Sequence, residues 1–200
     1  MRGFITFEGG DGAGKSTLID KVFQFLLQKG VPVIKTRAPG GSRVGEAIRE
    51  LLLHKLPMSS RCELFLFLAD RAEHVDSVLQ PALDQKKIVL CDRYNDSTLA
   101  YQAGARGLPL DQVHSLCAFA SHHLQPDLTF YLDIDPTIAL QRLSLSKDRM
   151  ENESIDFHQK IREAFHQIAK DNPTRIRLLD ATLSPDQLFK QAMEYINVFL

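Results

Sequence analysis

The feature that most constrains the fold is a glycine-rich segment, residues 9–16, which fits the pattern G-x-x-x-x-G-K-[ST]. A short apolar stretch at residues 4–7 precedes it, and a segment with apolar residues at helical spacing follows at 16–29. Glycines let the backbone curl until several N–H groups point at one anion, and the N-terminus of the following helix adds partial positive charge. The sequence therefore predicts a strand, a phosphate-binding loop and a helix in succession.

The polar side chains of this loop have separate tasks. The ammonium group of Lys15 is expected to reach the β- and γ-phosphates of a nucleoside triphosphate, and the hydroxyl group of Ser16 is a ligand for Mg²⁺. The predicted triphosphate-binding residues are Gly9, Gly10, Asp11, Gly12, Ala13, Gly14, Lys15, Ser16 and Thr17. By itself the loop does not choose among a GTPase, a motor, an ATPase and a kinase.

Strand-like and helix-like segments alternate along the whole chain. Further apolar runs of strand length occupy residues 31–36, 88–91, 128–132 and 175–179. Helical patterns occupy residues 44–53, 60–79, 111–121 and 155–170, and another starts after Ser184. This alternation predicts one α/β domain over residues 1–200, with about five parallel strands and helices on both faces of the sheet.

Local signals refine this arrangement. Ser60 and Glu63 have the spacing of a capping box at the start of a helix, as do Ser184 and Gln187. Asp135 precedes a proline and predicts an N-cap. A polar run interrupts the helical pattern and predicts a short lid at about residues 143–154.

Composition limits the partners and the location that we expect. The 200 residues carry a net charge of −1, without the basic excess typical of a protein that binds nucleic acid. The longest uncharged apolar run, residues 64–69, is far shorter than the about 20 residues of a membrane span. Cys62, Cys91 and Cys117 are widely separated, which favours reduced thiols over a disulfide framework or a zinc site. We expect a cytoplasmic protein that binds neither nucleic acid nor membrane.

The strand predicted at 88–91 leads into Asp92 and Arg93. A carboxylate at this position suits a magnesium-bound water molecule, and an arginine at the carboxyl edge of the sheet suits a second phosphate group. The Asn-Lys-x-Asp signature for guanine does not occur in the sequence. Two phosphate sites that face each other indicate phosphoryl transfer between nucleotides rather than hydrolysis.

Taken together, these motifs resemble those of the thymidylate kinase family, in the family's order and over essentially the whole chain. The resemblance rests on residues 7–17, 36–41, 63–71, 92–94 and 148–151, with Ser97, Tyr101, Gln102 and Phe157. It implies a P-loop NTPase fold and a cytosolic homodimer. It also implies transfer of a phosphoryl group from ATP, with Mg²⁺, to thymidine 5′-monophosphate, which gives the diphosphate for dTTP synthesis.

The resemblance implies how the acceptor phosphate is bound. Arg93 would grip the monophosphate through two of its guanidinium nitrogens, and Asp11 would orient Arg93 and contact the acceptor. The alternative for Arg93 is a structural salt bridge to Asp92 or Asp11, which is compatible with that role. Arg49 and, more weakly, Arg37 match further phosphate-binding positions. Ala38 stands where the family has a glutamate, which leaves the role of that carboxylate open.

The resemblance also implies how the nucleoside is bound. Phe67 would stack on the thymine ring and Arg71, one helical turn further on, would point at its edge, although apolar neighbours alone would place Phe67 in the core. Tyr101 would pack against the deoxyribose and leave no room for a 2′-hydroxyl group. The rest of this wall would come from Ser97, Thr98 and Gln102.

Positive charge for the transferring phosphoryl group is expected from the lid. Some family members carry a catalytic arginine directly after the acid of the loop, where this chain has Gly12. The resemblance therefore makes Arg149 the first choice, with Arg142 next and Lys147 as a third candidate. A solvated loop without a catalytic role is the alternative for these side chains.

Three other functions stay open at this point. A kinase of another nucleotide or nucleoside would keep the loop and change the surroundings of Phe67, Arg71 and Tyr101. A GTPase-like switch is disfavoured by the missing guanine signature. A nucleotide-binding module without activity would be expected to lack Lys15, Asp92 or Arg93, and all three are present. The sequence leaves open the dimer face and how strictly thymidylate is preferred over deoxyuridylate, because one methyl group separates them.

Overall fold

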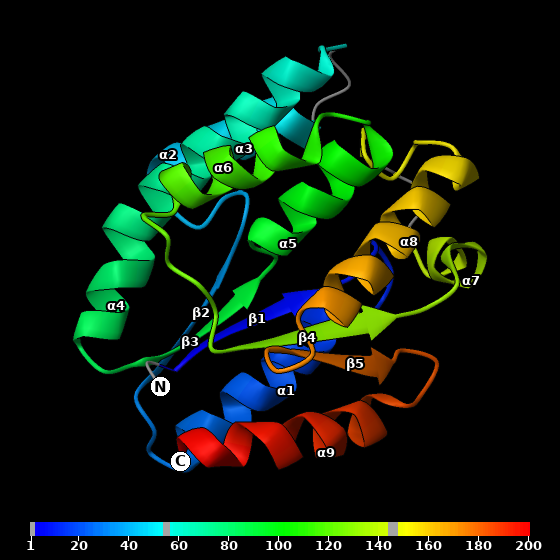
Figure 1. Cartoon of the computed structure of the whole chain (residues 1–200). Coiled ribbons are helices and arrows are strands. Elements are labelled where there is room, and N and C mark those ends of the chain that lie inside the picture. The colour runs from blue at the N-terminus through cyan, green and yellow to red at the C-terminus, as the bar shows by residue number, and fades with distance from the viewer. Residues whose placement is uncertain (1–2, 54–56, 144–147) are drawn as a thin grey trace.

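A computed structural model of the chain describes residues 3–53, 57–143 and 148–200 (Figure 1). Its strands form one parallel five-stranded sheet in the order β2-β3-β1-β4-β5, which confirms the predicted sheet. The strands are β1 (Phe4–Glu8), β2 (Val33–Arg37), β3 (Ile88–Asp92), β4 (Leu128–Asp133) and β5 (Ile176–Asp180). The central strand β1 ends at the phosphate loop, so this loop leaves the middle of the carboxyl edge.

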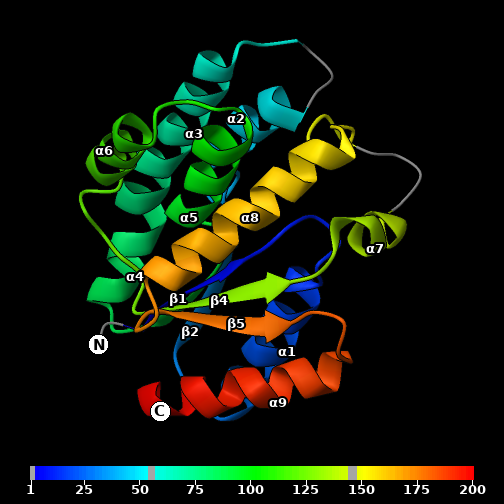
Figure 2. The same ribbon diagram turned by 45° about the vertical axis from the view of Figure 1, so that its right-hand side comes forward.

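Helices cover both faces of the sheet (Figure 2). Helices α1 and α9 pack on each other below it, whereas α8 lies above β4 and β5. The α-helices are α1 (Lys15–Gln28), α2 (Arg43–Leu53), α3 (Ser60–His74), α4 (Gln80–Asp84), α5 (Asn95–Thr98), α6 (Leu110–Ala120), α7 (Pro136–Gln141), α8 (Ile155–Asp171) and α9 (Pro185–Ile196). A 3-10 turn, η3 (Asn197–Phe199), ends the chain.

Two of the helices pass through π-helical turns. Segment η1 (Val75–Leu79) joins α3 to α4, so the helix predicted to end near residue 79 continues to Asp84. Segment η2 (Leu99–Ala105) prolongs α5, and this helix after Arg93 was not predicted at all. A π-turn places one more residue in a turn than an α-helix does, which breaks the apolar period that sequence patterns rely on.

The core lies in two layers, one on each side of the sheet. Phe7 and Phe130 meet at 5.4 Å between ring centroids, in the layer between the sheet and helices α1 and α9. On the opposite side, Phe4 and Tyr94 meet edge to face at 4.9 Å. Phe4, Phe7 and Phe130 are on strands and Tyr94 follows the end of β3, so both pairs help to fix the sheet that positions the loops. In the part of the chain that the structure describes, no helix is both long enough and apolar enough to cross a membrane.

The start of α3 corrects one prediction. The N-cap is Ser59, whose Oγ accepts a hydrogen bond from the backbone N–H of Cys62 at 3.3 Å, and Ser60 is the first helical residue. Glu63 does not complete a capping box, because its carboxylate is buried and pairs with arginines elsewhere. The predicted capping box at Ser184 and Gln187 and the predicted N-cap at Asp135 are both confirmed.

This correction predicts that Ser59→Ala lowers the free energy of unfolding by about 0.5–2 kcal/mol, because the N–H of Cys62 loses its acceptor. Ser60→Ala is the matched control and should change stability by less than about 0.5 kcal/mol. Urea titrations of both variants measure the difference. A larger loss for Ser60→Ala than for Ser59→Ala would restore the sequence-based assignment of the cap.

Candidate active site

The phosphate loop curls between β1 and α1 and is packed too closely for side chains at two glycines. Gly12 has φ +79°, and a Cβ atom there would lie 2.1 Å from the carbonyl oxygen of Ala139. At Gly9, a Cβ atom would lie 2.6 Å from the carbonyl oxygen of Leu132. The glycine pattern of the motif therefore has a steric cause, since α7 and the end of β4 rest directly on the loop.

Lys15 is folded over this loop. Its Nζ donates to the carbonyl oxygens of Gly9 and Gly10 at 3.1 and 2.9 Å. Burial lowers the pKa of Lys15, with a further contribution from the cation of Arg93, and nearby carboxylates oppose both effects. The ammonium group is thus held at the mouth of the loop, where it faces an incoming phosphate.

A candidate Mg²⁺ site lies beside the lysine. The hydroxyl group of Ser16 donates to Oδ2 of Asp92 at 3.2 Å, and strand pairing sets Asp92 next to Phe7 at the end of β1. Within the described residues, the other carboxylate oxygen of Asp92 is buried and has no hydrogen-bond partner. A hydroxyl and a carboxylate with a spare oxygen fit the hard oxygen ligands of Mg²⁺ and its water shell.

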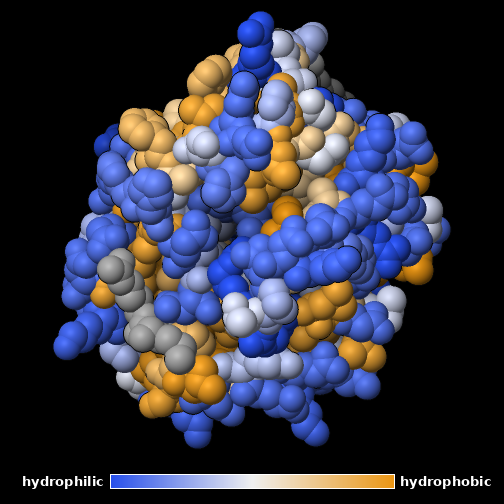
Figure 3. Space-filling view, viewed as in Figure 1, coloured by the Kyte–Doolittle hydropathy of each residue, from blue (hydrophilic) through white to orange (hydrophobic). Residues whose placement is uncertain are grey.

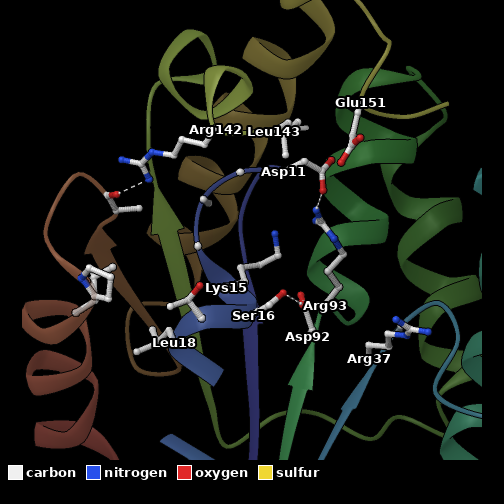
Figure 4. Close-up of a pocket in the computed structure, with 18 of the residues that line it drawn as sticks. Asp11, Lys15, Ser16, Leu18, Arg37, Asp92, Arg93, Arg142, Leu143 and Glu151 are labelled. Carbon is white, nitrogen blue, oxygen red and sulfur yellow. Dashed lines mark hydrogen bonds and ion pairs between the residues drawn. The ribbon is translucent and has the colours of Figure 1, made fainter. Parts of the chain in front are cut away.

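These groups open into a cavity of about 670 Å³ along the carboxyl edge of the sheet (Figure 4). Arg142 lies on the α7 side of the cavity, and Arg93 and Arg37 lie on the β3 and β2 side. Nη1 of Arg142 donates to the carbonyl oxygen of Ala181 at 3.1 Å. The cavity is long and lined by cations on both sides, as a bound triphosphate requires.

Arg93 is the centre of the site. Its guanidinium group donates to the Gly9 carbonyl oxygen at 2.9 Å and to Ser97 Oγ at 3.2 Å, and forms a 2.5 Å ion pair with Asp11. The guanidinium carbon lies 5.1 Å from the centroid of the Tyr101 ring. Burial would raise the pKa of Asp11, but the charge of Arg93 outweighs it and keeps that pKa below its ordinary value. The predicted ion pair between Asp11 and Arg93 is present.

Glu8 holds two groups next to Arg93, the backbone N–H of Tyr94 and the hydroxyl group of Ser97. No role was predicted for Glu8 from the sequence. This fully buried carboxylate accepts hydrogen bonds from the Tyr94 N–H at 2.6 Å and from Ser97 Oγ at 2.5 Å. Burial, together with the neighbouring Asp96, raises the pKa of Glu8 to about 7. A glutamate that ends an otherwise apolar strand directly before the loop was the available signal.

A second, smaller cavity of about 80 Å³ lies on the other side of Arg93. All but one of the predicted acceptor residues line it: Asp11, Arg49, Phe67, Arg71, Arg93, Ser97, Thr98, Tyr101 and Gln102. Arg37 lines the larger cavity instead. The core cluster of this region takes Leu64 and Leu68 from α3, whereas Phe67 is only half-buried and faces the cavity. The structure therefore brings the predicted acceptor residues together.

Arg71 is prepared to donate into this second cavity. Its guanidinium carbon lies 4.1 Å from the centroid of the Tyr94 ring. Nε and Nη1 of Arg71 are buried and have no hydrogen-bond partner within the described residues. Two buried donors without acceptors cost free energy unless a ligand pairs with them, so their presence indicates a polar ligand edge.

Other residues of α3 hold the turn at residues 38–42 and were missed by the sequence reasoning. Asp70 accepts from the N–H of Gly40 at 2.8 Å, and Nε2 of His74 lies 2.7 Å from Oγ1 of Thr36. Burial is the main reason that the pKa of His74 falls to about 3, so this imidazole is neutral. Ala38 lies in this turn and lines both cavities.

The predicted lid cations lie in different places. Arg142 lines the larger cavity, as described above. Arg149 is turned away, with Nη1 2.6 Å from Oε2 of Glu63 and Nε donating to the Leu52 carbonyl oxygen at 2.9 Å. Its predicted contact with the transferring phosphoryl group has no support from this geometry. Lys147 lies outside the described residues, and of the predicted lid the structure describes residue 143 and turns at 148–154.

Comparison with known proteins decides the family. The family model described as thymidylate kinase matches residues 7–192. This chain belongs to the thymidylate kinase family. The thymidylate kinase of Protochlamydia amoebophila (strain UWE25) is 42% identical over an alignment of 206 positions, which covers 97% of this chain and 92% of the relative. That of Synechococcus sp. (strain JA-3-3Ab) is 46% identical over 182 residues, covering 91% and 89%.

A solved structure gives the same result for the fold. The crystal structure of thymidylate kinase from Ehrlichia chaffeensis matches with a TM-score of 0.83 and 33% sequence identity, and the match covers 97% of each chain. The resemblance inferred from the motifs and the P-loop NTPase fold are therefore both confirmed. The comparisons thus show the family and the fold, and the geometry of this chain shows which of its side chains lie together around the two cavities.

The environment of Glu8 predicts a pH dependence of stability. The folded protein holds this proton up to about pH 7, whereas the unfolded chain releases it near the ordinary value of 4.5. The stabilisation from that proton is therefore complete below pH 4.5 and is lost as the pH rises through 7.

The variant Glu8→Gln has no such proton to lose. As the pH is raised from about 5 to about 8, the free energy of unfolding of Glu8→Gln should therefore increase relative to that of the wild type. Denaturant titrations of both proteins over this range measure the difference. A difference that stays constant with pH would mean that Glu8 is already ionised throughout.

Proposed function

We propose that this protein is a thymidylate kinase in the strict sense, an enzyme that transfers the γ-phosphoryl group of ATP to thymidine 5′-monophosphate. The products are thymidine diphosphate and ADP, and Mg²⁺ accompanies ATP. One observation carries this proposal: Asp11, Ala38, Arg49 and Arg93 line both cavities, so a triphosphate in one and a monophosphate in the other would meet at these residues.

The phosphate ends are placed by cations. We propose that Lys15 and Arg142 hold the donor phosphates and that Arg93, Arg49 and Arg37 hold the acceptor phosphate. A monophosphate oxygen is already a nucleophile, so the enzyme needs positioning and neutralised charge rather than a general base. Asp11 then acts on Arg93, since its carboxylate fixes the fork of the guanidinium group. Ser16 and Asp92 would hold Mg²⁺, which supplies further neutralisation of phosphate charge when bound.

The nucleoside end is placed in the smaller cavity. Phe67 offers a ring face to the base, and the unpaired donors of Arg71 suit a carbonyl oxygen at its edge. Tyr101 is buried below Arg93, and its hydroxyl group donates to Asp11 at 3.3 Å. The ring therefore cannot swing away to admit a larger sugar without breaking contacts to the phosphate-binding pair. Ser97, Thr98 and Gln102 complete this wall.

We also propose that the enzyme is a cytoplasmic homodimer that serves dTTP synthesis, as the family resemblance implies. Helices α3 and α6 pack on each other and expose large apolar side chains, among them Phe65, Leu110 and Phe119. Apolar residues gather at the upper left of Figure 3, over the region of these helices. Sedimentation velocity on the purified protein would test the dimer.

The direct test is ADP formation from ATP and Mg²⁺ with a panel of acceptors: dTMP, dUMP, dCMP, dGMP, UMP, thymidine and none. We expect turnover to be strongest with dTMP. Preference for another acceptor would keep the loop and Arg93 in their roles and overturn Phe67, Arg71 and Tyr101 as determinants of thymidylate binding. Equal ADP formation without an acceptor would overturn the kinase assignment.

The packing of Tyr101 predicts the choice of sugar. Tyr101→Ala should raise kcat/KM for UMP relative to dUMP by about tenfold, because the space for a 2′-hydroxyl group opens. Tyr101→Phe keeps the ring and serves as the control, so its ratio should stay at the wild-type value. If the alanine variant discriminates between the two sugars as well as the wild type, another residue excludes the ribose.

A further inference from the structure

Glu63 is a buried charge for which the mechanism above has no use. Its side chain is 1% exposed, in the first turn of α3, one turn before Phe67. It accepts from Gln102 Nε2 at 2.9 Å, from Arg106 Nε and Nη2 at 3.0 and 3.1 Å, and from Arg149 Nη1 at 2.6 Å. One carboxylate on α3 thus joins two side chains at the end of η2, Gln102 and Arg106, to Arg149 in the turn before α8.

This carboxylate is ionised. Burial alone would raise the pKa of Glu63, but the hydrogen bonds from Arg106, Gln102 and Arg149 outweigh it and hold the pKa below its ordinary value. An ionised carboxylate only accepts hydrogen bonds. The amide of Gln102 must therefore present its NH₂ group to Glu63. Its carbonyl oxygen is then the atom available to the smaller of the two cavities, here called the acceptor cavity, which Gln102 lines.

Orientation of that amide has a chemical consequence for the base. A carbonyl oxygen accepts a hydrogen bond from an N–H group, such as the one at N3 of thymine or uracil. It opposes the lone pair at N3 of cytosine. If Gln102 could turn over, its NH₂ group would favour the opposite choice. Glu63 therefore holds the amide in the orientation that suits thymine.

Arg149 connects the same carboxylate to the turn at residues 148–153. Its backbone N–H donates to the Leu53 carbonyl oxygen at 3.3 Å and its Nε to that of Leu52 at 2.9 Å. The neighbours of Arg149 in sequence, Asp148 and Met150, line the acceptor cavity. Arg106 secures the other end of the turn through a 2.6 Å ion pair with Glu153.

The side chain of Arg149 thus points to Glu63 while the residues on either side of it face the acceptor. Arg142, in contrast, lines the cavity of the phosphate loop. Arg149 is not among the described residues that line either cavity. The pair of Glu63 and Arg149 therefore lies behind the wall that Asp148 and Met150 give to the acceptor cavity, and it adds no cation to the lining of either cavity.

We propose that Glu63 is a positioning residue for the acceptor base, with Arg149 as its partner, and that Arg149 does not contact the transferring phosphoryl group. Glu63 acts in two ways. It fixes the orientation of the Gln102 amide, and through Arg149 it holds Asp148 and Met150 against the acceptor. This inference rests on the proposed function, because it needs thymidylate as the acceptor of the wild-type enzyme.

Steady-state kinetics of Glu63→Gln and Arg149→Gln test the proposal, with dTMP and dCMP as acceptors. For both variants we expect the KM for dTMP to rise about tenfold and the dTMP-to-dCMP ratio of kcat/KM to fall about tenfold. We expect kcat with dTMP and the KM for ATP to stay within about threefold of the wild type. The KM for dTMP of the double variant should be close to that of either single variant, since both substitutions remove the same ion pair between Glu63 and Arg149.

Arg162→Gln is the matched control. Arg162 is a partly buried arginine that pairs with Asp133 at 2.8 Å, so its loss breaks a comparable ion pair at a distance from Glu63 in the fold. The KM for dTMP and the ratio of acceptors should not change in this variant. Thermal melts of all variants establish that they are folded before the kinetics are compared.

Two outcomes would overturn the proposal. A fall of kcat by about 10²–10³ in Arg149→Gln, with Glu63→Gln near the wild type, would make Arg149 a catalytic residue. An unchanged dTMP-to-dCMP ratio in Glu63→Gln would remove the positioning role. Should Glu63→Gln fail to fold, Arg149→Gln still tests the proposal: a rise in the KM for dTMP supports the positioning role, and a fall in kcat contradicts it. Failure of the proposed function is distinct, because then the wild type itself would not turn over dTMP.

Discussion

The guanidinium group of Arg93 joins the two halves of the site, and the geometry on either side depends on how it is held. Its backbone has φ +70°, in a region that residues other than glycine seldom adopt and keep only when their surroundings hold them. Glu8 supplies that support by accepting from the next peptide N–H, and Asp11 and Gly9 fix the other end of the side chain. Burial would lower the pKa of Arg93, but the carboxylates of Asp11 and Asp92 help to raise it, so the cation stays charged inside the site.

Sheet order makes this meeting possible. Strand β1 lies between β3 and β4, so the phosphate loop and the Asp92–Arg93 segment leave adjacent strands at the same edge. Strand β2 pairs with β3 on its far side and brings Arg37 level with Asp92. Donor and acceptor groups therefore come from neighbouring strand ends, as the general rule for ligands of open α/β sheets requires.

The sequence predicts those parts of the molecule whose causes are local. The glycine pattern, the apolar strands and the caps at Asp135 and Ser184 each depend on a few adjacent residues, and all of them are found in the structure. Glu8 and Glu63 lie in segments that carry the family resemblance, but their roles were missed because their partners are distant in the chain. Arg149 illustrates the same limit, since a polar run cannot show that its arginine pairs with a carboxylate on α3, far earlier in the chain.

The π-turn of η2 carries Tyr101 and Gln102 into the acceptor cavity. In an α-helix each residue adds a rotation of about 100°, so one residue fewer before Tyr101 would carry both side chains to another face of the helix. Substitutions along this helix change one contact at a time, whereas an insertion or a deletion reassigns all of them. The number of residues between Arg93 and Arg106 is thus a determinant of recognition in its own right, and one that no single side chain encodes.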